Sequence, residues 1–112
     1  MSIDFAGHCR LPIAEANRRL AYLRNTRPDW FGGVLAVSDA ALGRFDREIA
    51  LEFGVDAQSH FSLHLLNKAW LDEARDAVEF VYQVFGTDDL VITYGNDSVR
   101  PPLRPYPPMD IG

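Results

Sequence analysis

Four side chains in the middle of the sequence have the chemistry of metal ligands. They recur at intervals of four residues and are Glu52, Asp56, His60 and His64. A four-residue step places side chains on one face of a helix, where carboxylates and imidazoles can bind a divalent metal. Gly54 predicts a helix end, which would move Glu52 away from the other three. Three protein ligands leave a position for a water molecule, which the metal would activate for hydrolysis.

The two histidines also have a simpler interpretation. If residues 57–66 form a strand, His60 and His64 merely share one face of a sheet. The sequence leaves helix and strand open for this segment. A small metal-dependent hydrolase using Asp56, His60 and His64 is therefore an alternative hypothesis, and the favoured interpretation includes no cofactor.

Cys9 is the single cysteine, and it follows His8 directly. A catalytic thiolate would need a base from elsewhere in the fold, such as His60 or His64. No known signature surrounds this cysteine, so a small buried structural residue is the expectation. One cysteine excludes an internal disulfide and fits a reducing, cytoplasmic compartment.

Residues 48–65 contain a loose two-element motif. Ala50, Gly54 and Val55 stand at the positions of a small residue, a turn glycine and a following apolar residue. The stretch resembles the helix-turn-helix pattern of small DNA-binding domains. The resemblance implies a DNA-binding regulator that reads DNA through residues 59–68. This segment has no arginine or lysine before Lys68, and phosphate contacts supply much of DNA affinity, so nucleic acid is not the expected partner.

Apolar spacing and turn residues predict the elements that would position these groups. Pro12 suits the first turn of a helix, Ser38 is expected to cap a second and Asn67 a third. The three predicted helices cover approximately residues 12–26, 38–53 and 67–85.

The β-rich run Leu90–Tyr94 predicts a strand, and the apolar run 34–37 predicts a brief one. A strand needs a neighbour, and if residues 60–66 supply it, the helix 67–85 becomes a right-handed crossover between two parallel strands. The expected fold class is α+β. It is a small single domain with three or four helices, a short sheet of two or three strands and an extended Pro-rich C-terminal arm.

The predicted boundary separates a globular domain over residues 1–99 from the arm over residues 100–112. Five of the seven prolines lie in the arm, which makes it stiff and extended. An alternative is that the arm lies along its own domain, with Leu103, Tyr106 and Met109 packed against it.

Length and charge limit the function classes. The 112 residues, 47% of them hydrophobic, suffice for one domain, and no apolar run is long enough to span a membrane. The net charge is −5, and residues 28–97 hold 13 of the 16 acidic residues but only 4 of the 11 basic ones. An acidic centre attracts basic surfaces and repels phosphate backbones.

The favoured hypothesis is a small cytoplasmic protein-binding module without catalysis, acting as an adaptor, regulator or inhibitor. It presents an acidic face to a larger protein partner with a basic surface, and a homodimer is a further option. Carboxylates on the outside of the third helix form that face, and aromatic residues of a Gly-rich loop and of the arm are the candidate contact anchors. The predicted contact residues are Asp72, Glu73, Asp76, Glu79, Trp30, Phe31 and Tyr106.

Overall fold

Alternating strands and helices make up the computed structural model, which describes residues 3–94 and 98–111. A short 3-10 turn, η1 (Lys68–Trp70), leads into the third helix. The elements are β1 (Asp4–Cys9), α1 (Ile13–Thr26), β2 (Leu35–Val37), α2 (Asp46–Glu52), β3 (Ser59–Leu65), α3 (Leu71–Phe85), β4 (Leu90–Tyr94) and β5 (Ser98–Arg100).

The five strands form one antiparallel sheet in the order β2-β3-β1-β4-β5. The predicted short sheet of two or three strands is therefore wrong, although the chain is a small α+β domain. Because β1 pairs antiparallel with both β3 and β4, these two strands run parallel to each other with β1 between them. The helix α3 connects them across the inserted strand, so they are not the adjacent pair that a simple crossover would join.

The central strand β1 escaped prediction because Gly7 interrupts its apolar run. Packing explains this glycine: a Cβ atom at position 7 would overlap the ring of Phe61 on β3. That ring also packs against Phe85 of α3, with 5.3 Å between the ring centroids. The residue that weakens the local strand propensity is the residue that the core requires.

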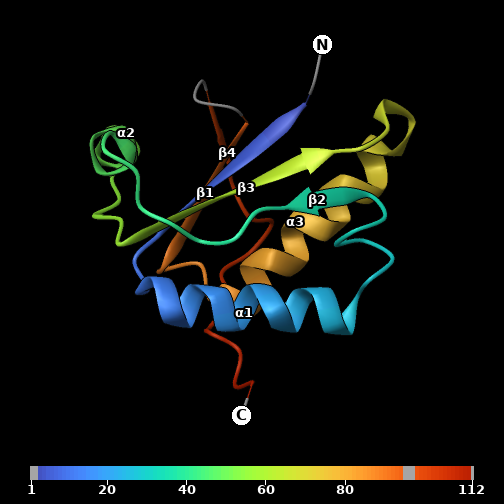
Figure 1. The fold of residues 1–112 in the computed structure, drawn as a ribbon, viewed down its shortest axis with the longest axis horizontal. Helices are drawn as coiled ribbons and strands as arrows, with labels where there is room; N and C mark the ends of the chain where they lie inside the picture. The colour runs from blue at the N-terminus through green and yellow to red at the C-terminus, as the bar shows by residue number, and fades with distance from the viewer. Residues whose placement is uncertain (1–2, 95–97, 112) are drawn as a thin grey trace.

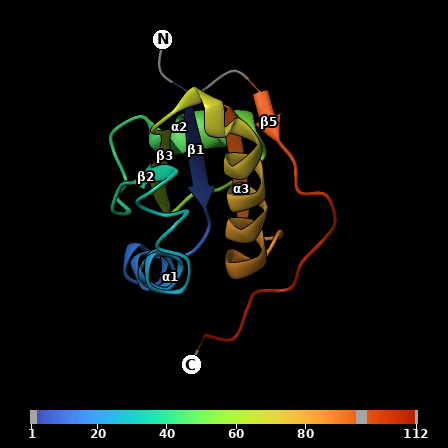
Figure 2. The same cartoon turned by 90° about the vertical axis from the view of Figure 1, so that its right-hand side faces the viewer.

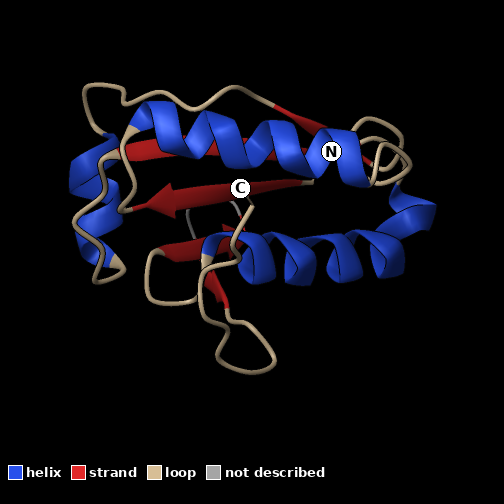
Figure 3. Ribbon diagram, turned by 90° about the horizontal axis from the view of Figure 1, so that it is seen from below, coloured by secondary structure: helices blue, strands red, loops and turns tan. Residues whose placement is uncertain are grey.

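One face of the sheet is covered by α1 and α3, which lie side by side (Figure 3). Phe61 and Leu63 of β3 and Ile92 of β4 point into this layer and are fully buried. The predicted helices at 12–26 and 67–85 are confirmed, and the Asn67 side chain accepts the Ala69 N–H at 2.9 Å. The predicted strand Leu90–Tyr94 is confirmed as well.

The other face of the sheet carries α2 at one end only, and α2 lies apart from α1 (Figure 1). Side chains alternate along a strand, so His8 and Val91 point away from the core that Cys9 and Leu90 enter. A second small cluster forms there, made of Ala50, Val55, Ala57 and Val91.

The prediction of a helix beginning at Ser38 is wrong. Helix α2 begins at Asp46, and the Ser38 hydroxyl instead accepts the backbone N–H of Ser62 on β3 at 2.9 Å. Gly43 donates its N–H to the Asp46 carboxylate at 2.5 Å, which fixes the turn before α2. Ser38, which was predicted to cap a helix, therefore connects its loop to the sheet.

The arm leaves β5 and runs along the α3 side of the molecule (Figure 2). Thr87 donates its backbone N–H to the Tyr106 carbonyl at 3.0 Å, and Met109 donates to the Val84 carbonyl at 3.3 Å. Tyr106 and Met109 are half-buried, as the alternative prediction has it, but Leu103 is 84% exposed. The division into residues 1–99 and 100–112 stays a prediction.

Within residues 3–94 and 98–111, none of the helices has the length and apolar character needed to cross a bilayer.

Candidate protein-binding surfaces

The three predicted metal ligands are not brought together. Asp56 lies before β3 and pairs with Arg47 at 3.1 Å, while His64 Nδ1 lies 2.5 Å from Asp4 Oδ1. His60 and His64 share one face of β3, as the strand interpretation has it. In the described part of the chain, no group of three or more His, Cys, Asp or Glu side chains is arranged to hold a metal ion. The hydrolase hypothesis thus loses its predicted site.

The helix-turn-helix interpretation fails at the same segment. Residues 59–65 form strand β3, which pairs on both sides, with β1 and β2. A strand in the middle of a sheet cannot enter a DNA groove as a recognition helix. The period-2 alternation His60, Phe61, Ser62 was the feature in the sequence that favoured a strand.

Cys9 is a buried structural residue. Its side chain is fully enclosed, and its sulfur accepts the Leu11 N–H at 3.3 Å. Burial raises the pKa of the Cys9 thiol, which keeps it neutral and unreactive.

The outer side of α3 brings together several predicted contact residues. Trp30, Asp76 and Glu79 line a hollow of about 340 Å³ between α3 and the arm. Asp72 and Glu73 are exposed nearby on the same helix. We refer to Trp30, Asp72, Glu73, Asp76 and Glu79 as the α3 surface.

The α3 surface is less acidic than the sequence suggests, because arginines lie among its carboxylates. Arg27 places its guanidinium 3.4 Å from the Trp30 ring centroid and forms an ion pair with Asp29 at 2.8 Å. Arg75 lies 3.7 Å from Asp72. Each of these arginines lies within three residues of the aspartate that it pairs with, so the compensation of charge is local.

Glu79 is engaged by the chain itself. Both oxygens of its carboxylate accept the Leu103 N–H at 3.1 Å, and one also accepts the Tyr106 hydroxyl. This hydrogen bond raises the pKa of Tyr106 above its ordinary value. Glu79 therefore anchors the arm.

Phe31 does not serve as an exposed anchor in this structure. It is only 4% exposed and belongs to the main core, where its ring lies beside those of Trp30 and Phe80. Trp30 is half-buried in the same aromatic group. Of the two predicted loop anchors, only Trp30 retains surface for a contact.

A second hollow lies on the opposite face of the sheet, and the sequence did not indicate it. Its volume is about 450 Å³, and it separates α2 from β1 and β3. The strand register places Asp4 opposite His64 and Ala6 opposite Ser62. Its polar lining consists of Asp4, Asp46, His60, Ser62 and His64.

His8 is buried beside this second hollow. Its ring lies 5.7 Å from the Phe53 ring and 5.2 Å from the His60 ring, measured between centroids. Its Nδ1 atom has no hydrogen-bond partner within the described residues. Burial and, to a smaller extent, the neighbouring His60 lower the pKa of His8 to about 4, while Asp46 opposes the shift. The imidazole is therefore neutral near pH 7.

Comparison with known proteins identifies the family. Residues 1–98 match the family model described as CDI System Immunity Component. This chain belongs to that family. The prediction of a small protein-binding protein that acts as an inhibitor is confirmed at this coarse level.

The fold of this immunity component also occurs in a solved structure. A chain of the CdiA-CT/CdiI toxin and immunity complex from Burkholderia pseudomallei superposes with a TM-score of 0.81 at 24% sequence identity. The alignment covers 90% of this immunity component and 99% of that chain. No curated protein matches the sequence.

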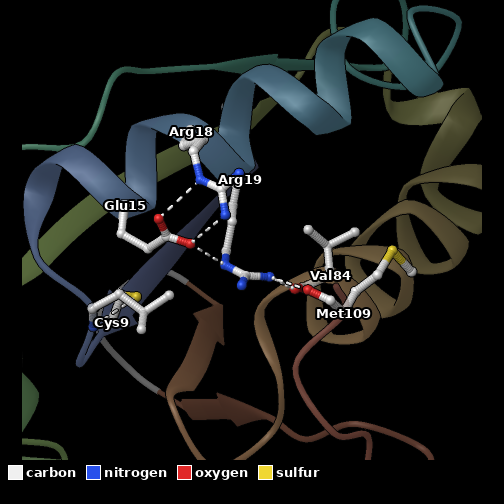
Figure 4. Close-up of polar contacts among 7 residues, drawn as sticks. Cys9, Glu15, Arg18, Arg19, Val84 and Met109 are labelled. Carbon is white, nitrogen blue, oxygen red and sulfur yellow. Dashed lines mark hydrogen bonds and ion pairs between the residues drawn. The ribbon is translucent and has the colours of Figure 1, made fainter. Parts of the chain in front are cut away.

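A buried arginine ties the arm of the immunity component to its helices (Figure 4). Arg19 of α1 donates to the carbonyl oxygens of Val84 at 2.5 Å and Met109 at 2.9 Å. It also bonds Glu15 at 3.0 Å. Arg19 is buried, whereas Arg18, which bonds the same glutamate, is exposed. Only the contact between α1, α3 and the arm explains this position.

Proposed function

We propose that this chain is the immunity protein of a toxin–immunity pair, and that it binds and inhibits a CdiA-CT-type toxin domain. The observation that carries the proposal is the family match, which extends over residues 1–98. The similar fold in a toxin and immunity complex supports the same class of partner. The larger protein partner predicted from sequence is then the toxin.

Inhibition by binding requires a large, complementary contact. A stable interface buries about 800 Å² on each partner, which is a substantial share of a domain of this size. The acidic centre of the chain favours a toxin with a basic surface, because opposite charge accelerates encounter and excludes wrong partners. The exposed carboxylates of the α3 surface, Asp72, Glu73 and Asp76, and the half-buried Trp30 remain the contact predicted from sequence. We place the complex in the cytoplasm, where a free Cys9 stays reduced.

Coexpression tests this proposal directly. The CdiA-CT-type toxin domain of the same strain is produced with and without this chain, and growth is measured. We expect growth to be restored only when the chain is present, and the two proteins to elute together at equal stoichiometry. The CdiA-CT domain of the Burkholderia pseudomallei complex serves as the mismatched control. Inhibited growth and separate elution with the toxin of the same strain would contradict the proposal.

Light scattering of the free chain tests the option of a homodimer. A monomer mass would remove that option and leave the toxin-binding proposal unaffected.

A further inference from the structure

The hollow between α2 and the sheet has the chemistry of a receptor for a cationic side chain. We propose that the toxin docks on the α2 side of the sheet and places a lysine or arginine side chain in this hollow. This inference rests on the proposed function and names the surface that carries it. We refer to Asp4, Asp46, Ser62 and the apolar residues Leu42, Phe45 and Leu51 as the α2 surface.

The shape of the hollow suits one long side chain. Its floor is formed by neighbouring strands, with Asp4 on β1 opposite His64 on β3 and Ser62 beside them. Its wall is formed by Asp46 and Ile49 of α2. A volume of about 450 Å³ lies in the range of small-ligand pockets and exceeds what one lysine or arginine needs.

The charge of the hollow suits a cation. One carboxylate comes from each wall, Asp4 from the sheet and Asp46 from α2. Asp46 Oδ2 lies 3.9 Å from His60 Nδ1 and accepts the Gly43 N–H, so its position is fixed. Around it, residues 39–56 contain five acidic residues and only two arginines. Carboxylates in fixed positions bind guanidinium and ammonium groups strongly.

Exposed apolar side chains accompany the hollow. Phe45 is 57% exposed and Leu51 is 60% exposed, and Leu42 is exposed three residues before Phe45. Interfaces combine apolar and aromatic anchors with a polar rim, and this segment supplies both within ten residues of chain. Single exposed apolar residues are ordinary, but here three of them lie in the same segment as Asp46 and Ile49, which line the hollow.

The segment that carries these residues is held at both ends. Before α2, Ala41 and His60 exchange backbone hydrogen bonds at 2.9 and 2.6 Å. After α2, Val55 and Ala57 are buried against Val91. A surface that is already ordered loses less entropy on binding, which favours tight association.

The α3 surface lacks this combination. Glu79 is occupied by the arm, and Asp72 has Arg75 beside it. The hollow beside α3 is also lined by Arg27, Arg75 and Arg100, which would repel a toxin cation, whereas the described residues that line the α2 hollow include no arginine or lysine. The α2 surface is therefore the stronger docking surface.

Two matched double variants test the inference. Asp4→Asn with Asp46→Asn removes two charges from the α2 surface but keeps the oxygen acceptors that face His64 and Gly43. Asp72→Asn with Asp76→Asn removes the same net charge from α3. Each variant is titrated by calorimetry with the CdiA-CT-type toxin domain of the same strain, at low and at high salt.

We expect the α2 pair to weaken toxin binding by about 10- to 100-fold and to reduce its salt dependence. The α3 pair should change the affinity by less than about 3-fold, because rim charges contribute little. An effect of the α3 pair that equals or exceeds that of the α2 pair would overturn the inference.

A steric variant gives an independent check. Ser62→Arg places a bulky cation in the hollow and should weaken binding by more than about 100-fold, since it both fills the space and repels a basic partner. Glu73→Arg on α3 changes the net charge by two, twice the change made by Ser62→Arg, and should nevertheless weaken toxin binding less. Thermal unfolding of each variant establishes that it is folded. If the wild-type chain binds and Ser62→Arg binds equally well, the inference is wrong; if the wild-type chain does not bind, the proposed function fails.

Discussion

The two faces of the sheet use their polar side chains differently. On the α1 and α3 side, buried and half-buried polar groups bond to the chain itself: Arg19 binds two backbone carbonyls and Glu79 holds the arm. On the α2 side, Asp4 contacts His64 and Asp46 accepts the Gly43 N–H, and both carboxylates also line a hollow. His8 is buried there, and its Nδ1 atom has no hydrogen-bond partner among the described residues.

Glu79 maintains the fold by holding the arm, whereas the side chains of Asp4 and Asp46 contact their own chain and still remain partly exposed in the hollow. A carboxylate that already accepts two hydrogen bonds stabilises its own chain, and a partner would have to displace those bonds. Charge counted along the sequence does not distinguish a carboxylate that holds the fold from one that lines an open hollow. Only the position of each carboxylate in the tertiary structure distinguishes them.

The largest expected effect is on stability, from Arg19→Met. The substitution removes the arginine donor to the Met109 carbonyl and one of the two donors to the Val84 carbonyl, and it should lower the free energy of unfolding by about 3 kcal/mol. Arg18→Met is the matched control, since Arg18 also bonds Glu15 but is exposed (Figure 4). Its expected cost is about 0.5 kcal/mol or less. If urea denaturation gave the same loss of unfolding free energy for Arg19→Met and Arg18→Met, the stability of the α3 side would not depend on the buried arginine.

On the α2 side, acid should destabilise the protein through His8. Burial lowers the pKa of His8 from 6.5 to about 4, so the unfolded chain binds the proton first as the pH falls. Stability from this residue is complete above pH 6.5 and is lost between pH 6.5 and 4. At pH 5 the loss should reach about 2 kcal/mol.

The variant His8→Phe isolates this contribution, because it retains a ring beside Phe53 but cannot titrate. The difference in unfolding free energy between variant and wild type should therefore change with pH over this range, while the carboxylates common to both cancel. Parallel stability curves for the two proteins would contradict the assigned role of His8.

The smallest of these effects is expected from Glu79→Ala. Loss of the acceptor for Leu103 and Tyr106 should cost about 1 kcal/mol and speed hydrogen exchange at the Leu103 N–H. Without the Glu79 hydrogen bond, the pKa of Tyr106 should fall toward its ordinary value, which an ultraviolet titration measures. Glu73→Ala, on the exposed side of α3, is the control and should leave both readouts unchanged. Toxin affinity that falls with Glu79→Ala but not with Asp4→Asn would reverse the comparison between the two faces.

Local patterns predicted the elements that depend on local chemistry. The apolar period and the Asn67 cap identified α3, Pro12 marked the start of α1, and the β-branched run identified β4. The strand β1 was missed because it contains Gly7, which weakens the strand pattern. A glycine is needed there because a side chain would overlap the ring of Phe61, which is more than fifty residues away in the chain. The helix α2 was predicted too long because Ser38 bonds β3 instead of a helix turn.

The candidate site was predictable only in part. The sequence indicated an acidic surface and an aromatic loop, and it indicated that His60 and His64 share a face. It did not reveal the hollow beside them, since Asp4 and Asp46 reach it from elements that are distant in the chain. It also suggested Phe31 as a contact anchor, but this side chain is buried in the core.

Composition, periodicity and capping residues by themselves determined a small acidic α+β domain with two well-defined helices and a proline-rich arm. These properties depend on neighbours in the chain. Tertiary structure alone decided the strand order, the burial of Arg19, the engagement of Glu79 by the arm and the hollow behind α2. Each of these depends on contacts between segments that are distant in sequence, and the free energy of such a contact exists only when the fold brings its partners together.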